Sequence, residues 1–247
     1  MNAQYLTHDV GVFLGSTSLQ TDYGERGHLP SELNNNNLSI TVAHYLSFYN
    51  NTLRWDPNDI LQNHLMVKTA IQYVTNTKLE HHGIFAEKQS PEGERLRAMR
   101  GGVNILNLSM NVEYFLKPLE EFVYQASDIS FNPFVSFGLQ YSFYNNSLES
   151  TLGDWRQDIT VLPIKYRNED FLFIGSGESL GVNIGIGTRL KIAEKIDLVA
   201  QYNYTYFLSD KIDGLQTDRV ENRNNEWALD IQLGIVYHIN FSGPLFY

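Results

Sequence analysis

The sequence predicts an all-β fold, namely an eight-stranded antiparallel transmembrane β-barrel with long extracellular loops and a filled lumen. Three observations predict it. Apolar and polar residues alternate strictly over segments of about ten positions, the segments between them differ in length in a regular way, and no run of ~18 apolar residues marks a membrane helix. The 247 residues are predicted to form one domain, with residues 1–7 as a periplasmic tail.

Eight segments carry the alternation of a β-strand. In chain order, they are 10–14, 38–46, 65–73, 106–114, 133–143, 180–190, 196–206 and 229–239. An even number of strands brings both ends of the chain to the periplasmic side. The four long polar segments, 18–37, 75–102, 145–178 and 208–225, are then extracellular, and residues 193–195 form a tight periplasmic turn. Within 75–102, Ser90-Pro91-Glu92 predicts a short helix that runs through Met99 and has proline in its first turn.

Composition excludes several classes of function. The chain has no cysteine, which excludes disulfides, thiolate metal sites and a cysteine nucleophile. Its formal net charge of −10 argues against a nucleic-acid partner, because such partners are bound by basic surfaces. The first five residues lack the pattern of an export signal, so we expect that the signal of an outer-membrane protein is missing from this sequence.

The apolar face is interpreted as the face toward lipid. The opposite face consists of Gly, Asn, Ser, Gln and Thr with isolated charges, which suits the crowded lumen of an eight-stranded barrel. Aromatic residues lie near the strand ends, where interfacial girdles belong; they are Tyr73, Tyr114, Tyr141, Tyr204, Tyr206, Trp227 and Tyr237. The alternative is a soluble barrel with its apolar face inward.

Two groups of residues are predicted to matter for function. Charges on the lumen face gather toward the periplasmic end and are expected to pair into a plug; they are Asp9, Lys68, Glu113, Arg189, Lys191, Asp197 and His238. The alternative for this group is an ion or proton path. Large side chains in the periplasmic turns are predicted to dock a partner, with a fold-back under the barrel mouth as the alternative; they are Leu53, Arg54, Trp55, Phe122, Val123 and Tyr124.

Other motifs give weaker indications of chemistry. His81 and His82 are adjacent on an extended segment, so we expect them to diverge in a solvated loop and predict no metal site. The carboxylates at Asp154, Asp158, Asp210 and Asp213 have no spacing that specifies a catalytic pair with these histidines. The basic run of Arg95, Arg97 and Arg100 is interpreted as a solvated helix face rather than a site for lipopolysaccharide phosphates. The glycines at 181, 185 and 187 follow a strand period, so they indicate close packing and not a nucleotide loop.

Several motifs resemble the small outer-membrane barrels of the type IX secretion system, the PorG type. The opening strand His8-Asp-Val-Gly-Val-Phe-Leu-Gly15 and the hairpin made by 108–115 and 132–144 are similar to that family. So are Gly181-Val-Asn-Ile-Gly-Ile-Gly-Thr188, Tyr204-Thr-Tyr-Phe-Leu-Ser-Asp-Lys-Ile-Asp213 and Asn225-Glu-Trp-Ala-Leu229. The likeness covers about half of the chain, and segments 21–27 and 145–178 depart from it.

The resemblance implies a barrel that ties a periplasmic ring, made of a lipoprotein and its companion, to the outer membrane. We therefore expect a non-enzymatic anchoring or accessory subunit without a cofactor, whose partners are outer-membrane lipids and that ring. Because segments 21–27 and 145–178 depart from the family, the alternative that the chain is an accessory barrel of another outer-membrane complex stays open. An enzyme at the outer rim and a surface-binding barrel that uses its outer loops also stay open.

Overall fold

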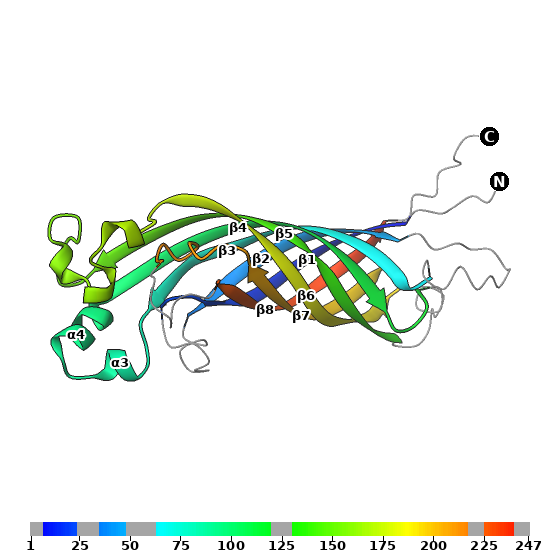
Figure 1. Ribbon diagram of the computed structural model, residues 1–247. Coiled ribbons are helices and arrows are strands. Elements are labelled where there is room, and N and C mark those ends of the chain that lie inside the picture. The colour runs from blue at the N-terminus through cyan, green and yellow to red at the C-terminus, as the bar shows by residue number, and fades with distance from the viewer. Residues whose placement is uncertain (1–6, 24–34, 48–62, 120–129, 217–224, 240–247) are drawn as a thin grey trace.

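The computed structural model describes residues 7–23, 35–47, 63–119, 130–216 and 225–239, and these form a closed barrel of eight antiparallel strands (Figure 1). Each strand pairs with the next in the chain, and β8 closes the barrel on β1. The strands are β1 (Thr7–Gln20), β2 (Asn36–Ser47), β3 (Leu65–Glu80), β4 (Met99–Phe115), β5 (Ser130–Ser150), β6 (Ser176–Ala193), β7 (Ile196–Phe207) and β8 (Trp227–Ile239). The predicted fold class is confirmed, and each predicted segment lies within one of these strands.

The two ends of the barrel differ. The first strand begins and the last strand ends at one end, where a tight turn also joins β6 to β7 (Figure 1). The opposite end carries the helices α3 (Ile84–Glu87) and α4 (Pro91–Ala98) and three short 3-10 turns, Ile159–Val161, Ile164–Tyr166 and Glu169–Phe171. Because short turns mark the periplasmic end of such barrels, the helical end is extracellular.

The predicted short helix is α4. Ser90 caps its amino terminus, since its Oγ accepts a hydrogen bond from the Gly93 N–H at 3.1 Å, and Pro91 occupies the first turn. The helix ends at Ala98, and Met99 already belongs to β4. Among the described residues, no helix is long and apolar enough to cross a membrane.

The apolar face of the strands points outward and the polar face points into the lumen. On β4, Leu108 is 41% exposed, whereas its neighbour Asn107 is 5% exposed. The same alternation runs around the barrel, because the register places Val42, Ile71 and Leu108 in one outward row. A soluble barrel would have the opposite arrangement. The exposed band is the surface that contacts hydrocarbon.

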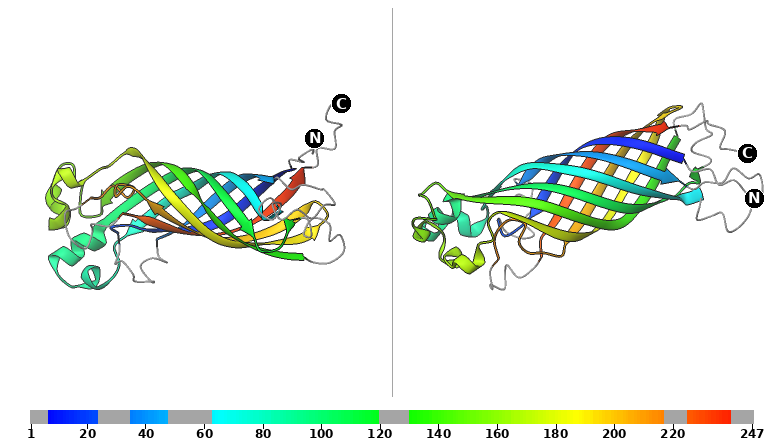
Figure 2. Two further views of the ribbon diagram at one scale, coloured as in Figure 1. Left: turned by 45° about the vertical axis from the view of Figure 1, so that its right-hand side comes forward. Right: turned by 90° about the horizontal axis from the view of Figure 1, so that it is seen from above.

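The strands on one side extend well beyond the membrane. β4 has 17 residues and β5 has 21, whereas ~9–11 residues cross the hydrocarbon layer. Figure 2 shows these strands reaching the helical end of the molecule. The pattern reverses there: Val103 and Leu148 point inward and are buried, while Asn145 and Ser147 face out. The predicted polar loops were too long at these points, because the reversed pattern hides the continuation of the strands.

Candidate functional site: a lumen closed at both ends

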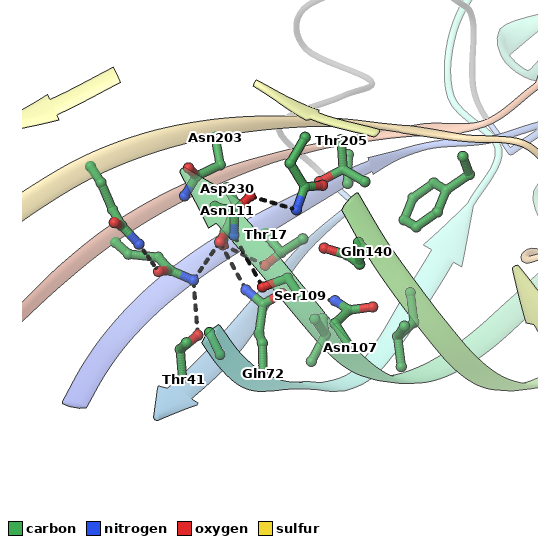
Figure 3. A pocket seen from close by; sticks show the side chains of 18 of the residues that line it. Thr17, Thr41, Gln72, Asn107, Ser109, Asn111, Gln140, Asn203, Thr205 and Asp230 are labelled. Carbon is green, nitrogen blue, oxygen red and sulfur yellow. Dashed lines mark hydrogen bonds between the residues drawn. The ribbon is translucent and has the colours of Figure 1, made fainter. Parts of the chain in front are cut away.

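The middle of the lumen is a small polar chamber. Its volume is about 40 Å³, which leaves room for a few water molecules at most. Figure 3 shows the side chains that line it, which are mainly amides and hydroxyls from all around the barrel. Asn183 on β6 accepts from Thr205 on β7 at 2.9 Å and donates to Asn111 on β4 at 3.3 Å. Lys68 on β3 donates to Gln201 on β7 at 2.7 Å, and this bond crosses the lumen between opposite strands. The lumen is filled because these side chains interdigitate.

Asp230 is the central acceptor of the chamber. Its carboxylate accepts hydrogen bonds from Thr17 at 2.7 Å, Ser39 at 3.1 Å and Gln72 at 2.8 Å, and it also contacts the amide of Gln232. A buried carboxylate requires such donors to offset its loss of hydration. Asp230 was not among the predicted site residues. The sequence did offer an indication of its role, because Asp230 is an acid at a lumen-facing position between the apolar residues of a strand.

The predicted lumen charges meet on the periplasmic side of this chamber. Arg189 lies at their centre with its side chain only 1% exposed. Its guanidinium lies 3.3 Å from Asp9, 3.7 Å from Asp197 and 3.9 Å from Glu113. A guanidinium carries five N–H donors in one plane, so a single arginine can face three carboxylates.

Lys68 and His238 join the same cluster. Lys68 Nζ lies 3.6 Å from Glu113 and donates to Gln201 at 2.7 Å. The two ring nitrogens of His238 each lie 2.9 Å from a carboxylate, one from Asp9 and the other from Asp197. Only the imidazolium form has a proton on both nitrogens, so this geometry favours charged histidine. Lys191, the seventh predicted residue, is also buried.

Aromatic side chains surround this charge cluster. The Arg189 guanidinium lies 4.3 Å from the ring centre of Tyr45 and 5.4 Å from that of Phe115. Lys68 Nζ lies 5.1 Å from the ring centre of Phe13. These inward aromatics belong to a buried cluster at the periplasmic half of the lumen. Sequence reasoning missed them, although apolar residues at lumen-facing positions were a signal.

A second, apolar cluster closes the extracellular end; we call it the cap. Strands and loops both contribute to it, including Val103, Ile105, Leu148, Leu162, Ile212 and Leu215. All of these side chains are nearly inaccessible. The chamber is therefore bounded by packed apolar side chains on one side and by paired charges on the other.

The predicted docking residues of the periplasmic turns lie outside the described part of the chain. Leu53, Arg54 and Trp55 lie outside the described residues, as do Phe122, Val123 and Tyr124. The predicted periplasmic tail also lies outside them up to residue 6, and β1 begins at Thr7.

Two of the residues considered for catalysis, Asp154 and Asp158, have structural roles in their own turns. Asp154 and Asp158 are exposed and accept backbone N–H groups of their own turns. Against expectation, His81 is not solvated: it is buried beside the rings of Tyr23 and Tyr166, at centroid distances of 4.7 and 5.9 Å. Burial holds the pKa of His81 well below its usual range. Within the described part of the chain, no hydrogen bond or ion pair joins His81 to these aspartates, and no cluster of three or more His, Cys, Asp or Glu residues is arranged for a metal.

The basic run near α4 is largely neutralised by its neighbours. Arg95 pairs with Glu92, and Arg100 lies 3.2 Å from Glu80. Arg97 donates to backbone carbonyls at the end of α3 and beyond it. The three arginines therefore organise the cap surface rather than forming an open anion site.

The closed barrel and its outward apolar band define an outer-membrane β-barrel with an occluded lumen, and this class of protein resides in the outer membrane. No protein-family model matches the chain, and no curated protein matches it significantly.

Solved structures of small barrels are similar in fold. A major outer membrane protein from Thermus thermophilus is 14% identical, with a TM-score of 0.48 over 94% of this chain and 99% of that one. Ail of Yersinia pestis is 11% identical, with a TM-score of 0.46 over 95% and 99%. The outer membrane enzyme PagL is 12% identical, with a TM-score of 0.36 over 94% and 99%. Because all three TM-scores are below 0.5, these likenesses carry no argument about function.

Proposed function

We propose that this protein is a non-enzymatic anchoring subunit of an envelope machine, the type IX secretion system. In this role its barrel holds the outer membrane and its periplasmic turns dock the ring lipoprotein and its companion. The observation that supports the proposal most directly is the lumen, which is closed at both ends. A barrel that conducts no solute through its lumen acts through the surfaces that it presents to other molecules.

The two closures of the lumen differ in chemistry, which argues against a transport path. A permeating ion would have to cross the apolar cap, whose residues Ile105, Leu162 and Leu215 are buried. It would then meet carboxylates that already pair with Arg189 and Lys68. Neither region offers a continuous hydrated route. The charge cluster is thus better understood as a plug that fixes the barrel than as an ion path.

The proposal is tested by photo-crosslinking in native membranes. A photoreactive amino acid is placed at Trp55 or Phe122 in the periplasmic turns, and at Leu108 on the lipid face as the matched control. We expect positions 55 and 122 to capture the same periplasmic lipoprotein or its companion, and position 108 to capture no protein. Capture of the ring proteins by neither turn would refute the assignment. Capture of an unrelated outer-membrane complex would favour the alternative of an accessory barrel elsewhere.

A second candidate function is surface binding by the extracellular end. The outermost elements expose large apolar side chains, with Phe85 on α3 66% exposed and Ile164 on the 3-10 turn Ile164–Tyr166 61% exposed. The 3-10 turn that carries Ile164 is tied to α4, because Glu92 accepts the Ile164 N–H at 3.0 Å. Exposed apolar groups of this size favour protein contact. Cross-links from Phe85 or Ile164 to an external protein would support this function and not the periplasmic one.

A further inference from the structure

The loop between β7 and β8 closes part of the cap. Its residues Ile212 and Leu215 are fully buried. The backbone of the loop pairs with the segment that precedes β6, since the Phe173 N–H donates to Gly214 O at 2.8 Å and the Gln216 N–H donates to Phe171 O at 2.9 Å. The described part of this loop, residues 208–216, therefore lies over the lumen as an ordered cover.

Two carboxyl groups hold this cover in place. Glu226, just before β8, accepts the N–H groups of Ile212 at 2.8 Å and Asp213 at 3.0 Å. Asp213 accepts the N–H of Leu215 at 2.8 Å and that of Asp22, just beyond β1, also at 2.8 Å. Four backbone donors from two loops thus depend on one pair of carboxyl groups, which we call the carboxyl pair.

The carboxyl pair is buried and faces no positive charge within the described residues. Asp213 and Glu226 are each 1% exposed and are hydrogen-bonded to one another. Neither takes part in an ion pair there, and Lys211 of the same loop lies over the ring of Phe173. The titratable groups that face the pair are Asp22 and Tyr23 beyond β1 and Tyr144 on β5.

Two buried carboxyl groups in contact cannot both be ionised without a large penalty. Burial, and then the negative charge of Asp22, raise the pKa of Asp213 to about 7. Burial, and then Asp213, raise the pKa of Glu226 well above its usual range. The closed loop therefore retains protons that an open, solvated loop would release.

We propose that Asp213 and Glu226 form a proton-dependent latch, which holds residues 208–216 of the β7–β8 loop over the lumen and weakens as the external pH rises. A carboxyl group whose pKa is raised in the closed state favours closure most at low pH, and that advantage is lost as pH rises toward the raised value. Opening would expose Ile212 and Leu215 and remove one side of the cap. The latch is independent of the periplasmic role proposed above, because no residue of the periplasmic turns takes part in it.

Hydrogen exchange of the full chain in detergent micelles tests the latch. After correction for intrinsic exchange, protection of the Ile212 and Asp213 amides should fall about tenfold per pH unit for each proton released, between about pH 5 and pH 7. The Leu162 amide is the internal control, because it lies in the same cap but bonds to Ile159 O and should show no such slope. Equal slopes at Leu162 and Ile212, or no slope at either, would overturn the proposal.

Two substitutions locate the effect. In Asp213→Asn and in Glu226→Gln, the slope of the logarithm of Ile212 protection against pH should be lost or fall to half or less of its value in the unaltered protein. The reason is that each substitution removes one titrating group. The matched control is Asp158→Asn, which removes an exposed carboxylate from another extracellular turn and should keep the full slope. A full slope in both Asp213→Asn and Glu226→Gln would contradict the proposal. If either variant fails to form the barrel, the pH profile of the unaltered protein still decides the question.

Discussion

Single side chains determine how the lumen stays closed, and Arg189 is the clearest case. It is the one cation of the cluster that lies within 4 Å of all three acids in the described structure. Replacing Arg189 by Met should cost ~3–5 kcal/mol of unfolding free energy, because the change leaves Asp9, Glu113 and Asp197 buried without their common partner. Urea unfolding in lipid vesicles measures this.

The matched control for that substitution is Arg100→Met. Arg100 lies 3.2 Å from Glu80, but both side chains are well exposed to solvent. An exposed pair contributes ~0–1 kcal/mol, so the control should unfold nearly as the unaltered protein does. Similar losses in the two variants would mean that the lumen cluster is as hydrated as the surface.

The outward faces of β4 and β8 give a second prediction for single residues, through Leu108 on β4 and Ile231 on β8. Leu108→Arg or Ile231→Arg should cost ~2–4 kcal/mol, because each side chain lies in the lipid-facing band near the middle of a strand. Ser109→Ala changes a lumen-facing residue and should cost much less. Equal losses at Leu108 and Ser109, measured by the same unfolding assay, would show that the band is not in hydrocarbon.

At the scale of strands, close packing between neighbours depends on small residues. Phe13 on β1 lies against Gly234 on β8, where an added Cβ would stand 2.2 Å from Phe13 Cδ1. Gly234→Ala should therefore cost ~1–3 kcal/mol through overpacking. The double variant with Phe13→Leu should recover part of this loss, and a double-mutant cycle measures the coupling. Strictly additive losses would mean that the ring does not rest on the glycine.

Strands were largely predictable from the sequence where they cross the membrane, and less so beyond it. Within the membrane, the two-residue period is reinforced by a sharp contrast between outward Leu, Ile and Val and inward Asn, Ser and Gly. Ile105 and Leu106 are adjacent apolar residues on β4. From Leu106 toward the membrane the apolar side chains face outward, whereas Val103 and Ile105 face inward and pack into the cap. A pattern that follows only the outward apolar face ends at that point, although β4 continues to Met99.

The candidate site was predictable only in part, for a related reason. Lumen charges such as Asp9 and Arg189 stand out between apolar residues, so their shared face could be inferred from the period. Their aromatic neighbours Phe13 and Tyr45 resemble the residues of the lipid face by type, and only their phase in the strand period, which Phe13 shares with Asp9, indicates that they point inward. The contact between Asp213 and Glu226 depends on the closure of a loop, which no periodic pattern encodes.

At the scale of the whole molecule, the two closures of the lumen act in series. The cap blocks the extracellular side with apolar packing, and the Arg189 cluster blocks the periplasmic side with paired charges. Between them lies a chamber of about 40 Å³, which the hydrogen bond from Lys68 to Gln201 crosses. A path for ions therefore requires both closures to fail together.

This arrangement predicts that the protein does not conduct, whatever the state of the β7–β8 loop. Purified protein in planar bilayers should give no stable ohmic steps at pH 5 or at pH 8, because release of the loop would open only the cap while Arg189 still bridges Asp9 and Asp197. A porin reconstituted in the same bilayers is the control for detection. Steps that appear only at the higher pH would mean that the cap is the sole barrier, and steps at both values would mean that the lumen is open throughout.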